Sequence, residues 1–244
     1  SGLVGEGRMA EPEEIIDFLL NDINSEKELF GKNCLVTAGP TQENIDPVRF
    51  IGNRSSGKMG MAIANELAEK GAKVNLVMGP SNLSSSHYNI NQINVHSANQ
   101  MYDEVEKVFL DSDISVFTAA VSDYKPTHIY SEKIKRSEDN LEIKLEKTKD
   151  ILLEMSSDKK DHQFVVGFAL ETENEKENAI QKLQKKNLDM IILNSNKDKG
   201  ATFGFDTNKI SIIEKDLSVT NYKLKEKSDV AKDIVLAIIK RTNI

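Results

Sequence analysis

The stretch "SSGKMGMAIANELAEKGAKVNLVMGP", residues 55–80, decides the predicted fold. Its first part has apolar residues at the spacing of one helix face, at Met59, Ile63, Leu67 and Ala68. Gly71 is a typical helix stop, and the apolar run 73–80 that follows has the pattern of a buried strand broken by Gly-Pro. Another continuous apolar run, "CLVTAG" at 34–39, precedes the helix. Two apolar strands joined through a helix indicate a parallel sheet.

The same alternation continues along the rest of the chain. Further strands are expected at 91–98, 113–123, 163–172, 188–195 and 209–216, and helices at 99–110, 173–187 and 227–244. We therefore predict an α/β fold: a Rossmann-like, doubly wound, mostly parallel sheet with helices on both faces. In such sheets ligands bind beyond the carboxyl ends of the strands, so Gly39, which ends the first strand, is an expected nucleotide contact.

The composition is that of an ordinary folded protein. The chain has 244 residues, 39% of them hydrophobic and 29% charged, and a formal net charge of −7. This acidic balance argues against non-specific binding to nucleic acid or to a membrane surface. The single cysteine, Cys34, lies in an apolar run and is expected to be a buried core thiol. No apolar run approaches the roughly 20 residues that span a bilayer, and there is no signal peptide, so we expect a cytoplasmic protein.

Residues 1–32 differ from the alternating pattern that begins at Asn33. They contain a predicted helix with Pro12 in its first turn, acidic neighbours and an apolar face, followed by a polar segment. One interpretation is a simple N-terminal helix, and the other is the tail of a preceding domain. The predicted boundaries are 1–32 for this part and 33–244 for the main domain.

The segment that begins at Gly52 matches the spacing of a P-loop, G-x-x-x-x-G-K, but the next residue is Met59. A P-loop needs Ser or Thr there to bind Mg²⁺ and follows its strand directly, whereas the predicted strand ends near Gly39. A nicotinamide site is also disfavoured, because "TAGPTQ" lacks G-x-G-x-x-G and no acidic residue ends the second strand. What remains is a helix start whose free N–H groups can face an anion, at Ser55, Ser56 and Gly57.

Further motifs stand in order along the chain: "VTAGPTQENIDPVRFIGNRSSGKMG" at 36–60, "TAAVSDY" at 118–124, "EKIKR" at 132–136, "VVGFALET" at 165–172, "KLQKKNLDMIILN" at 182–194 and "GATFGFDTNKISII" at 200–213. Together they resemble the signature of phosphopantothenate–cysteine ligases, the phosphopantothenoylcysteine synthetases of coenzyme A biosynthesis. The N-terminal "GEGRMAEPEEI" resembles the closing motif of the flavin-dependent decarboxylase that is fused ahead of the ligase in many bacteria. The resemblance implies that 1–32 are a decarboxylase remnant and linker and that 33–244 are the ligase domain. FMN would belong to the missing decarboxylase half.

The resemblance also implies a reaction. In the family, a nucleoside triphosphate with Mg²⁺ activates the carboxylate of 4′-phosphopantothenate and releases pyrophosphate, and the amine of L-cysteine then attacks the acyl-nucleotide. The fused layout favours CTP, an acyl-cytidylate and release of CMP, whereas eukaryotic relatives typically use ATP. A homodimer is implied as well, and the apolar strand "KISII" at 209–213 would be a natural interface element. Because two anions must meet, cations and fixed N–H dipoles are expected, and a protein nucleophile is not needed.

By resemblance, three residues carry the chemistry. Asn53 occupies the position of the asparagine associated with the acyl-nucleotide, and its carboxamide can donate to a developing oxyanion. Arg49 matches an arginine tied to the second half-reaction. Lys133, the first residue of "KIKR", matches a lysine tied to activation and would neutralise the phosphates from a mobile flap.

Other residues are carried over as nucleotide contacts. Asp123 is expected to hold Mg²⁺, Ala119 to approach the nucleotide through its backbone, and Phe168 to lie at the nucleobase. Lys182 and Lys186, which are four residues apart on one helix face, match a phosphate-binding pair of the family.

The family's cytosine-contacting P-D-I segment is matched by Lys149, Asp150, Ile151 and Leu152. Lys149 stands where the family usually has Pro. Two further departures are Arg136 in place of a usual Lys and Gly52 in place of the commoner Ser.

Two alternatives lie outside this enzyme class. A nicotinamide-dependent or nucleotide-sugar oxidoreductase would need the glycine fingerprint and Tyr-x-x-x-Lys, but Tyr130 is followed four residues later by Ile134. A catalytically inactive nucleotide-binding module would keep the same fold. The joint presence of Asn53, Arg49 and Lys133 argues against such a module.

Overall fold

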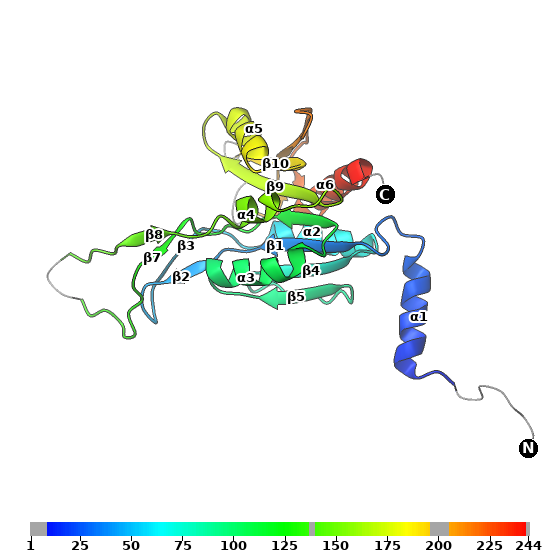
Figure 1. The fold of residues 1–244 in the computed structure, drawn as a ribbon, viewed down its shortest axis with the longest axis horizontal. Helices are drawn as coiled ribbons and strands as arrows, with labels where there is room; N and C mark the ends of the chain where they lie inside the picture. Colours follow the sequence, from blue (N-terminus) through cyan, green and yellow to red (C-terminus); the bar gives the residue numbers. More distant parts are fainter. Residues whose placement is uncertain (1–8, 137–139, 196–204, 243–244) are drawn as a thin grey trace, which may run out of the picture.

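The structure is a computed structural model that describes residues 9–136, 140–195 and 205–242 (Figure 1). Residues 5–8 of the "GEGRMAEPEEI" motif and residues 200–204 of "GATFGFDTNKISII" lie outside the described residues. The predicted N-terminal helix is present as α1, Pro12–Asn24, with Pro12 as its first residue. Figure 1 shows α1 apart from the sheet that forms the body of the molecule.

The central sheet has eight strands in the described part of the chain. In spatial order they are β13 (Val219–Asn221), β12 (Ile210–Glu214), β10 (Met190–Ser195), β9 (Phe164–Glu171), β6 (Ile114–Phe117), β1 (Asn33–Ala38), β4 (Lys73–Met78) and β5 (Ile90–Asn94). The strands from β10 to β5 are parallel, and β12 and β13 are antiparallel additions at one edge. The chain order therefore reverses between β1 and β6, which is the doubly wound arrangement, and the predicted fold class is confirmed.

Helices cover both faces of this sheet (Figure 1). One face carries α2 (Lys58–Glu69) and α6 (Lys227–Thr242), and the other carries α3 (Ala98–Phe109), α4 (Ile151–Ser157) and α5 (Glu175–Lys185). The start of α3 has a local cause: the Ser97 hydroxyl accepts the Gln100 N–H at 3.3 Å, and the Gln100 side chain reaches back to form a capping box. The helix α4 was not predicted from the sequence.

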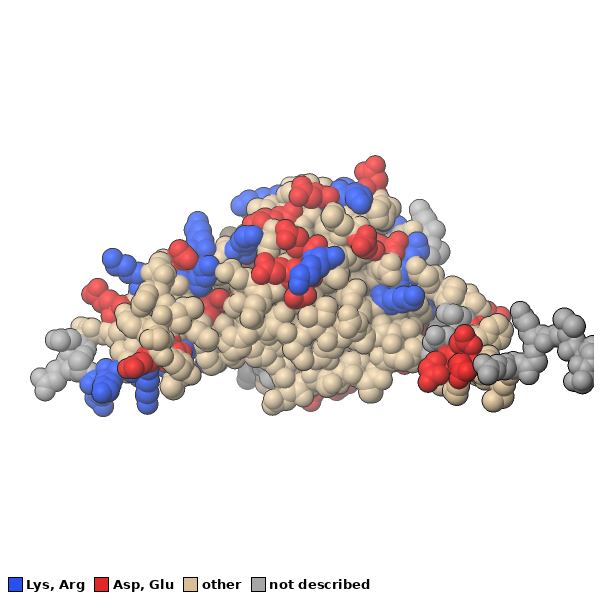
Figure 2. Space-filling view, turned by 60° about the horizontal axis from the view of Figure 1, so that its bottom comes forward, with Lys and Arg blue, Asp and Glu red and all other residues tan. Residues whose placement is uncertain are grey.

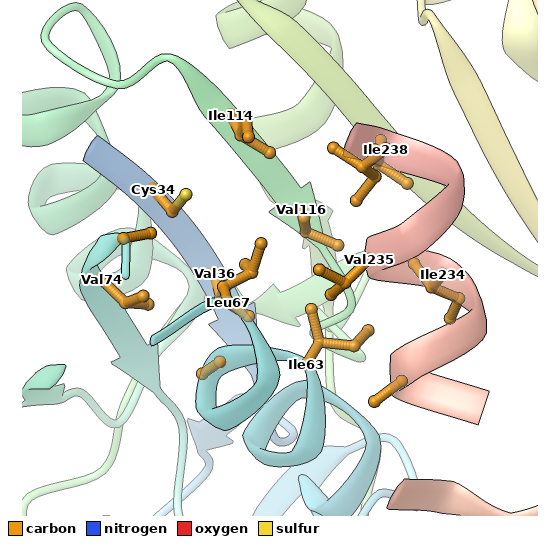
Figure 3. Close-up of a cluster of buried hydrophobic side chains, with 14 of the residues drawn as sticks. Cys34, Val36, Ile63, Leu67, Val74, Ile114, Val116, Ile234, Val235 and Ile238 are labelled. Atoms are coloured by element: carbon orange, nitrogen blue, oxygen red, sulfur yellow. The ribbon is translucent and has the colours of Figure 1, made fainter. Parts of the chain in front are cut away.

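The apolar strands are explained by two buried layers. Figure 3 shows the layer between the sheet and the α2–α6 pair, where the labelled side chains are fully or almost fully buried: Cys34, Val36, Ile63, Leu67, Val74, Ile114, Val116, Ile234, Val235 and Ile238. Leu35 of β1 belongs to the opposite layer, against α3. Burying each such aliphatic side chain contributes about 1.5–3 kcal/mol. Cys34 is a buried core thiol as predicted, and burial raises its pKa, so it is not a nucleophile.

One predicted strand is much shorter than expected. The strand expected at 113–123 ends at Phe117, the last of its residues that pairs with both β1 and β9. Beyond Phe117 the chain still bonds to β1 and to the loop after it, but it no longer pairs with β9. The Thr118 N–H donates to the Thr37 carbonyl at 3.1 Å, and the Ala120 N–H donates to the Gly39 carbonyl at 2.9 Å. Asp123 consequently lies on a loop beyond the sheet and not at a strand end.

Two short hairpins form an arm that extends from the carboxyl edge of the sheet (Figure 1). They are β2 (Gln42–Asn44) with β3 (Phe50–Gly52), and β7 (Tyr124–Pro126) with β8 (Leu145–Lys147). The first hairpin separates β1 from α2, which confirms that the segment at Gly52 is not a P-loop. Figure 2 shows Lys and Arg side chains gathered on the arm, with acidic ones among them, while the lower middle of that view carries few charges.

The strand "KISII" does not offer an open edge for an interface. Residues 210–213 of this segment belong to β12, which pairs with β10 on one side and with β13 on the other. Ile210, Ile212 and Ile213 are buried within this chain. The expectation of an interface at this strand is therefore wrong, because β13 covers its outer edge. A further two-stranded ladder joins β11 (Thr207–Asn208) to β14 (Lys225–Glu226). Among the described residues, none of the helices combines the length and the apolar character that crossing a bilayer requires.

Candidate functional site

The start of α2 is pressed against the carboxyl ends of the strands. Gly57, its N-cap, has φ +76°, and a Cβ added there would lie 2.4 Å from the Met78 methyl carbon. A Cβ on Gly60 would lie 2.5 Å from the Ala38 Cβ. Glycine is therefore required for this close approach.

The N–H groups of the first helical turn are left available. No side chain caps α2, and the backbone N–H groups of Lys58, Met59 and Gly60 have no hydrogen-bond partner within the described part of the chain. The Ser55 hydroxyl instead accepts the Gly57 N–H at 3.4 Å, and the Ser56 carbonyl accepts from Ser81 at 3.0 Å. This arrangement agrees with the predicted anion-facing helix start, whereas a serine N-cap is not formed.

Two adjoining cavities open at this edge of the sheet. The α4 cavity, of about 500 Å³, lies against the segment that starts α4, and the α2 cavity, of about 600 Å³, lies over the start of α2. They share five lining residues: Ala119, Ala120, Asp123, Phe168 and Lys182. We call these residues the shared wall. Each volume is within the range of small-molecule sites, and the location is the switch point between β1 and β6 where doubly wound sheets bind ligands.

The α4 cavity brings together one group of predicted residues. Besides the shared wall it is lined by Lys149, Asp150, Ile151, Leu152 and Lys186. Asp150 is the N-cap of α4: its Oδ1 accepts the Leu153 N–H at 3.1 Å and also lies 2.7 Å from the Lys186 Nζ. The predicted cytosine segment is thereby tied to one member of the predicted lysine pair.

Lys149, which departs from the family pattern, has a partner that sequence analysis missed. Its Nζ lies 3.5 Å from the centre of the Tyr102 ring, a cation–π contact. The Tyr102 hydroxyl donates to Glu106 at 2.9 Å. This hydrogen bond, together with burial, raises the pKa of Tyr102 to about 12, so the ring stays neutral.

Lys182 reaches from α5 into the shared wall. Its Nζ donates to the Phe168 carbonyl at 2.7 Å. Burial lowers the pKa of this amine, and the nearby charge of Lys186 lowers it further. Two adjacent amines that are partly removed from water form a site that an anion would stabilise.

The α2 cavity brings together a second group. It contains Asn53, Ser55, Ser56 and Gly57, as predicted for an anion site, and the Asn53 amide donates to the Val121 carbonyl at 2.8 Å. Among the lining residues that sequence analysis missed are Lys58, Asn208 and Lys227. Lys58 lies inside a quoted motif and could have been found there. Lys227 carries no local signal, because only the packing of α6 against α2 brings it to the cavity.

Three predicted residues line neither cavity in the described part of the chain: Gly39, Arg49 and Lys133. Gly39 is packed behind the loop, where an added Cβ would lie 3.0 Å from the Gly79 carbonyl oxygen. Lys133 is exposed on the arm, next to Ile134.

Arg49 anchors the segment that carries Lys133. Its Nη1 lies 2.9 Å from the Asp46 carboxylate, and both terminal nitrogens donate to the Ile134 carbonyl at 3.2 Å. Asp46 also accepts the N–H groups of Val48, Arg49 and Ile134. Burial opposes ionisation of Asp46, but these hydrogen bonds and the Arg49 charge outweigh it and lower the pKa of the carboxyl.

The residues present fit a metal ion that arrives with a nucleotide. Asp123 is exposed in the shared wall, and no group of three or more His, Cys, Asp or Glu in the described ranges could hold a metal by itself. Magnesium in nucleotide sites is typically bound by one or two carboxylates together with phosphate oxygens and water. Asp123 suits that mode of binding.

Comparison with known proteins identifies the family. The family model described as "DFP: DNA/pantothenate metabolism flavoprotein C-terminal domain" matches residues 29–242. The chain belongs to this family. The crystal structure of the C-terminal domain of the coenzyme A biosynthesis bifunctional protein CoaBC has a TM-score of 0.74 to this chain at 38% identity, covering 88% of this chain and 97% of that one. The predicted family resemblance is therefore confirmed.

Two relatives in sequence carry different names. The CoaBC protein of Haemophilus influenzae is 43% identical over 240 residues, which are 98% of this chain and 59% of that protein. A "Cysteine/Cysteine sulfinic acid decarboxylase" from an unknown prokaryotic organism is 49% identical over 243 residues, 98% of this chain and 68% of that protein. This chain thus spans about three fifths to two thirds of the length of these relatives, and each name describes the longer protein.

Proposed function

We propose that this chain is the phosphopantothenate–cysteine ligase domain of coenzyme A biosynthesis, joining 4′-phosphopantothenate to L-cysteine with CTP and Mg²⁺. Its main support is the pair of adjoining cavities, where lysines and the free N–H groups of α2 surround the shared wall. A reaction between a carboxylate and a triphosphate requires such a concentration of positive charge, since both reactants are anions.

In this proposal the two cavities divide the nucleotide between them. The apolar side chains of Ile151, Leu152 and Phe168 suit the base in the α4 cavity. The phosphates would pass along the shared wall towards the start of α2, where N–H groups and lysines can bind them. Asp123 would hold magnesium, which would supply positive charge to offset that of the phosphates.

The chemistry proceeds in two displacements. In the first, a carboxylate oxygen of phosphopantothenate bonds to the α-phosphorus while the bond to the β-phosphate breaks and pyrophosphate leaves. In the second, the cysteine nitrogen bonds to the acyl carbon, loses a proton, and CMP leaves. We propose that the Asn53 amide, held at the cavity by its bond to the Val121 carbonyl, donates to the oxygen that gains charge in these steps.

The roles of Arg49 and Lys133 are proposed to depend on the arm. Arg49 holds the Ile134 carbonyl and so anchors the segment on which the adjacent Lys133 is exposed, and we propose that this lysine binds a phosphate of the nucleotide. We include a homodimer in the proposal, because the arm exposes several large apolar residues, among them Val48, Phe50 and Ile129. A fused decarboxylase domain with FMN would account for the additional length of the CoaBC relative.

The decarboxylase name of one relative is compatible with this proposal. This chain shares the domain that contains the cavities with both relatives, and the name of the decarboxylase describes a longer protein, part of which has no counterpart in this chain. The first test of the proposed function compares the four nucleoside triphosphates as substrates. We expect pyrophosphate release from CTP with 4′-phosphopantothenate, in the absence of cysteine, and little release from ATP, UTP or GTP. Preference for ATP would correct the nucleotide, and no release from any triphosphate would support the inactive module.

A variant tests the role of Asn53. Asn53→Asp places a negative charge where the oxyanion develops, so amide formation should fall by about 100- to 1000-fold. The circular dichroism spectrum should stay unchanged, and the melting temperature should fall only slightly, because the bond to the Val121 carbonyl is lost. Asn99→Asp, at an exposed position of α3 away from both cavities, is the matched control and should keep full activity. Full activity of Asn53→Asp would show that the assignment is wrong.

A further inference from the structure

Two lysines at the starts of different helices line the α2 cavity. Lys58 is the first residue of α2, and Lys227 is the first residue of α6. The two helices pack against each other, and both lysines line the α2 cavity but not the α4 cavity. The positive ends of two helix dipoles therefore point to the same place as two ammonium groups.

The charges of this lysine pair are incompletely balanced. The Lys58 Nζ lies 2.5 Å from Asp206 Oδ1, but the Asp206 side chain is 71% exposed. The Lys227 Nζ donates to the neutral carbonyl of Phe205. Burial lowers the pKa of Lys227, and the charge of Lys58 lowers it further. Two ammonium groups thus share one solvated carboxylate, an arrangement that an incoming anion would stabilise.

The lining of the whole α2 cavity also carries an excess of positive charge. Its lining contains four basic residues, Arg54, Lys58, Lys182 and Lys227, against one acidic residue, Asp123. Asn208 also lines this cavity, where it is almost fully buried and its amide donates to Asn194 Oδ1 at 3.2 Å and to the Met59 sulfur at 3.7 Å. The lining of this cavity therefore suits a multiply charged anion.

The position of Lys58 and Lys227 in the α2 cavity indicates which part of the nucleotide they would bind. If the base occupies the α4 cavity and the α-phosphate lies at the shared wall, the remaining phosphates can enter the α2 cavity, which Lys58 and Lys227 line. We propose that Lys58 and Lys227 bind the β- and γ-phosphates of the nucleotide and hold them as inorganic pyrophosphate when the bond to the α-phosphorus breaks. This inference rests on the proposed function. The developing charge on the bridging oxygen would be offset by these two amines, which assists departure of the leaving group.

A purely structural role is the rival explanation. Lys58 and Lys227 both contact the segment at 205–206, so they could serve only to hold that segment. The two roles differ in one measurable respect. A structural role would disturb every ligand of the cavity alike, whereas a phosphate role concerns pyrophosphate and spares CMP, which lacks the β- and γ-phosphates.

The test measures binding of inorganic pyrophosphate and of CMP, each with Mg²⁺, by calorimetry. We expect Lys227→Met and Lys58→Met each to weaken pyrophosphate binding by about tenfold or more, the usual effect of losing a charged hydrogen bond, and to leave CMP binding within about twofold. The matched control is Lys225→Met. Lys225 lies two residues before Lys227, pairs with Asp233 and does not line the cavity. It should leave both affinities unchanged.

Three results would overturn the inference: no pyrophosphate binding by the unmodified chain, unchanged pyrophosphate binding in both lysine variants, or equal weakening of pyrophosphate and CMP. If the lysine variants do not fold, Asp206→Asn decides, since it frees Lys58 at an exposed position and should tighten pyrophosphate binding. Unchanged or weaker binding in that variant would count against the pair. Failure of the proposed ligase reaction would appear separately, as pyrophosphate binding without turnover in the unmodified chain.

Discussion

Lys182 provides a direct test of the shared wall. Lys182→Met removes the ammonium group and keeps most of the aliphatic stem. In the structure this amine lines both cavities, is partly buried and donates to the Phe168 carbonyl at 2.7 Å. The substitution therefore removes one charged donor from the wall along which the nucleotide is proposed to lie.

The magnitude follows from the type of bond that is lost. A hydrogen bond to a charged group contributes about 1.5 to 3 kcal/mol, so kcat/KM for the nucleotide should fall by roughly 10- to 150-fold. Stability should not fall with it. Because the folded-state pKa of Lys182 is lowered, the unfolded chain binds that proton more tightly, and the charged amine is a cost to folding at neutral pH. The melting temperature of the variant should therefore be equal to that of the unmodified chain or higher.

The pH dependence has a definite sign. An anionic nucleotide binds the protonated amine better, so its affinity should decline as the pH rises, beginning below the range of an ordinary lysine. Lys182→Met should lack this decline. The assay is pyrophosphate release across a pH series, with Lys185→Met, an exposed lysine of the same helix, as the control. Unchanged kcat/KM in Lys182→Met, or an unchanged pH profile, would refute the reasoning.

Two further substitutions test the backbone segments that border the two cavities, at the start of α2 and before α4. Gly57→Ala should lower stability by about 1 to 3 kcal/mol, or roughly 2 to 10 °C in Tm, because φ is +76° and the new Cβ meets Met78. Gly31→Ala, with φ +77° and open space around it, should cost less, and equal losses would contradict the packing argument. Lys149→Ala should raise KM for the nucleotide by roughly 2- to 30-fold at constant kcat, since a cation–π contact of about 0.5 to 2 kcal/mol orders the segment before α4. Tyr102→Phe, which keeps the ring, should leave KM nearly unchanged, and an equal rise in both variants would assign the effect to the hydroxyl instead.

The order of strands and helices was predictable because each element carries its own periodicity. The run 73–80 and the helix that precedes it contain their burial pattern within a few residues, and the structure has β4 and α2 there. The end of β6 was not predictable in this way. "VFTAAVS" is mostly apolar, yet the strand stops at Phe117, whose ladder partners are Thr37 of β1 and Gly167 of β9. The length of a strand depends on its neighbours, which a local pattern does not contain.

The candidate site shows the same division. The residues of the shared wall could be chosen from motifs, because Ala119, Asp123 and Phe168 follow or belong to predicted strands of one sheet. Tyr102, Lys58 and Lys227 could not be assigned together, since they come from three helices whose contacts are made only when the layers pack. The interface expected at "KISII" failed for a related reason: a strand's apolar residues do not reveal whether its outer edge is already paired, here by β13.

By itself, the sequence determined the α/β class, the parallel sheet, the burial of Cys34 and the family, because periodicity and ordered motifs are local properties that survive without coordinates. Only the tertiary structure decided that the anion-facing start of α2 and Lys182 of α5 line one cavity, and that Lys227 joins them from the far end of the chain. The physical reason is that the charge surplus of a site is a sum over side chains close in space. Those distances are set by how the helices pack on the sheet.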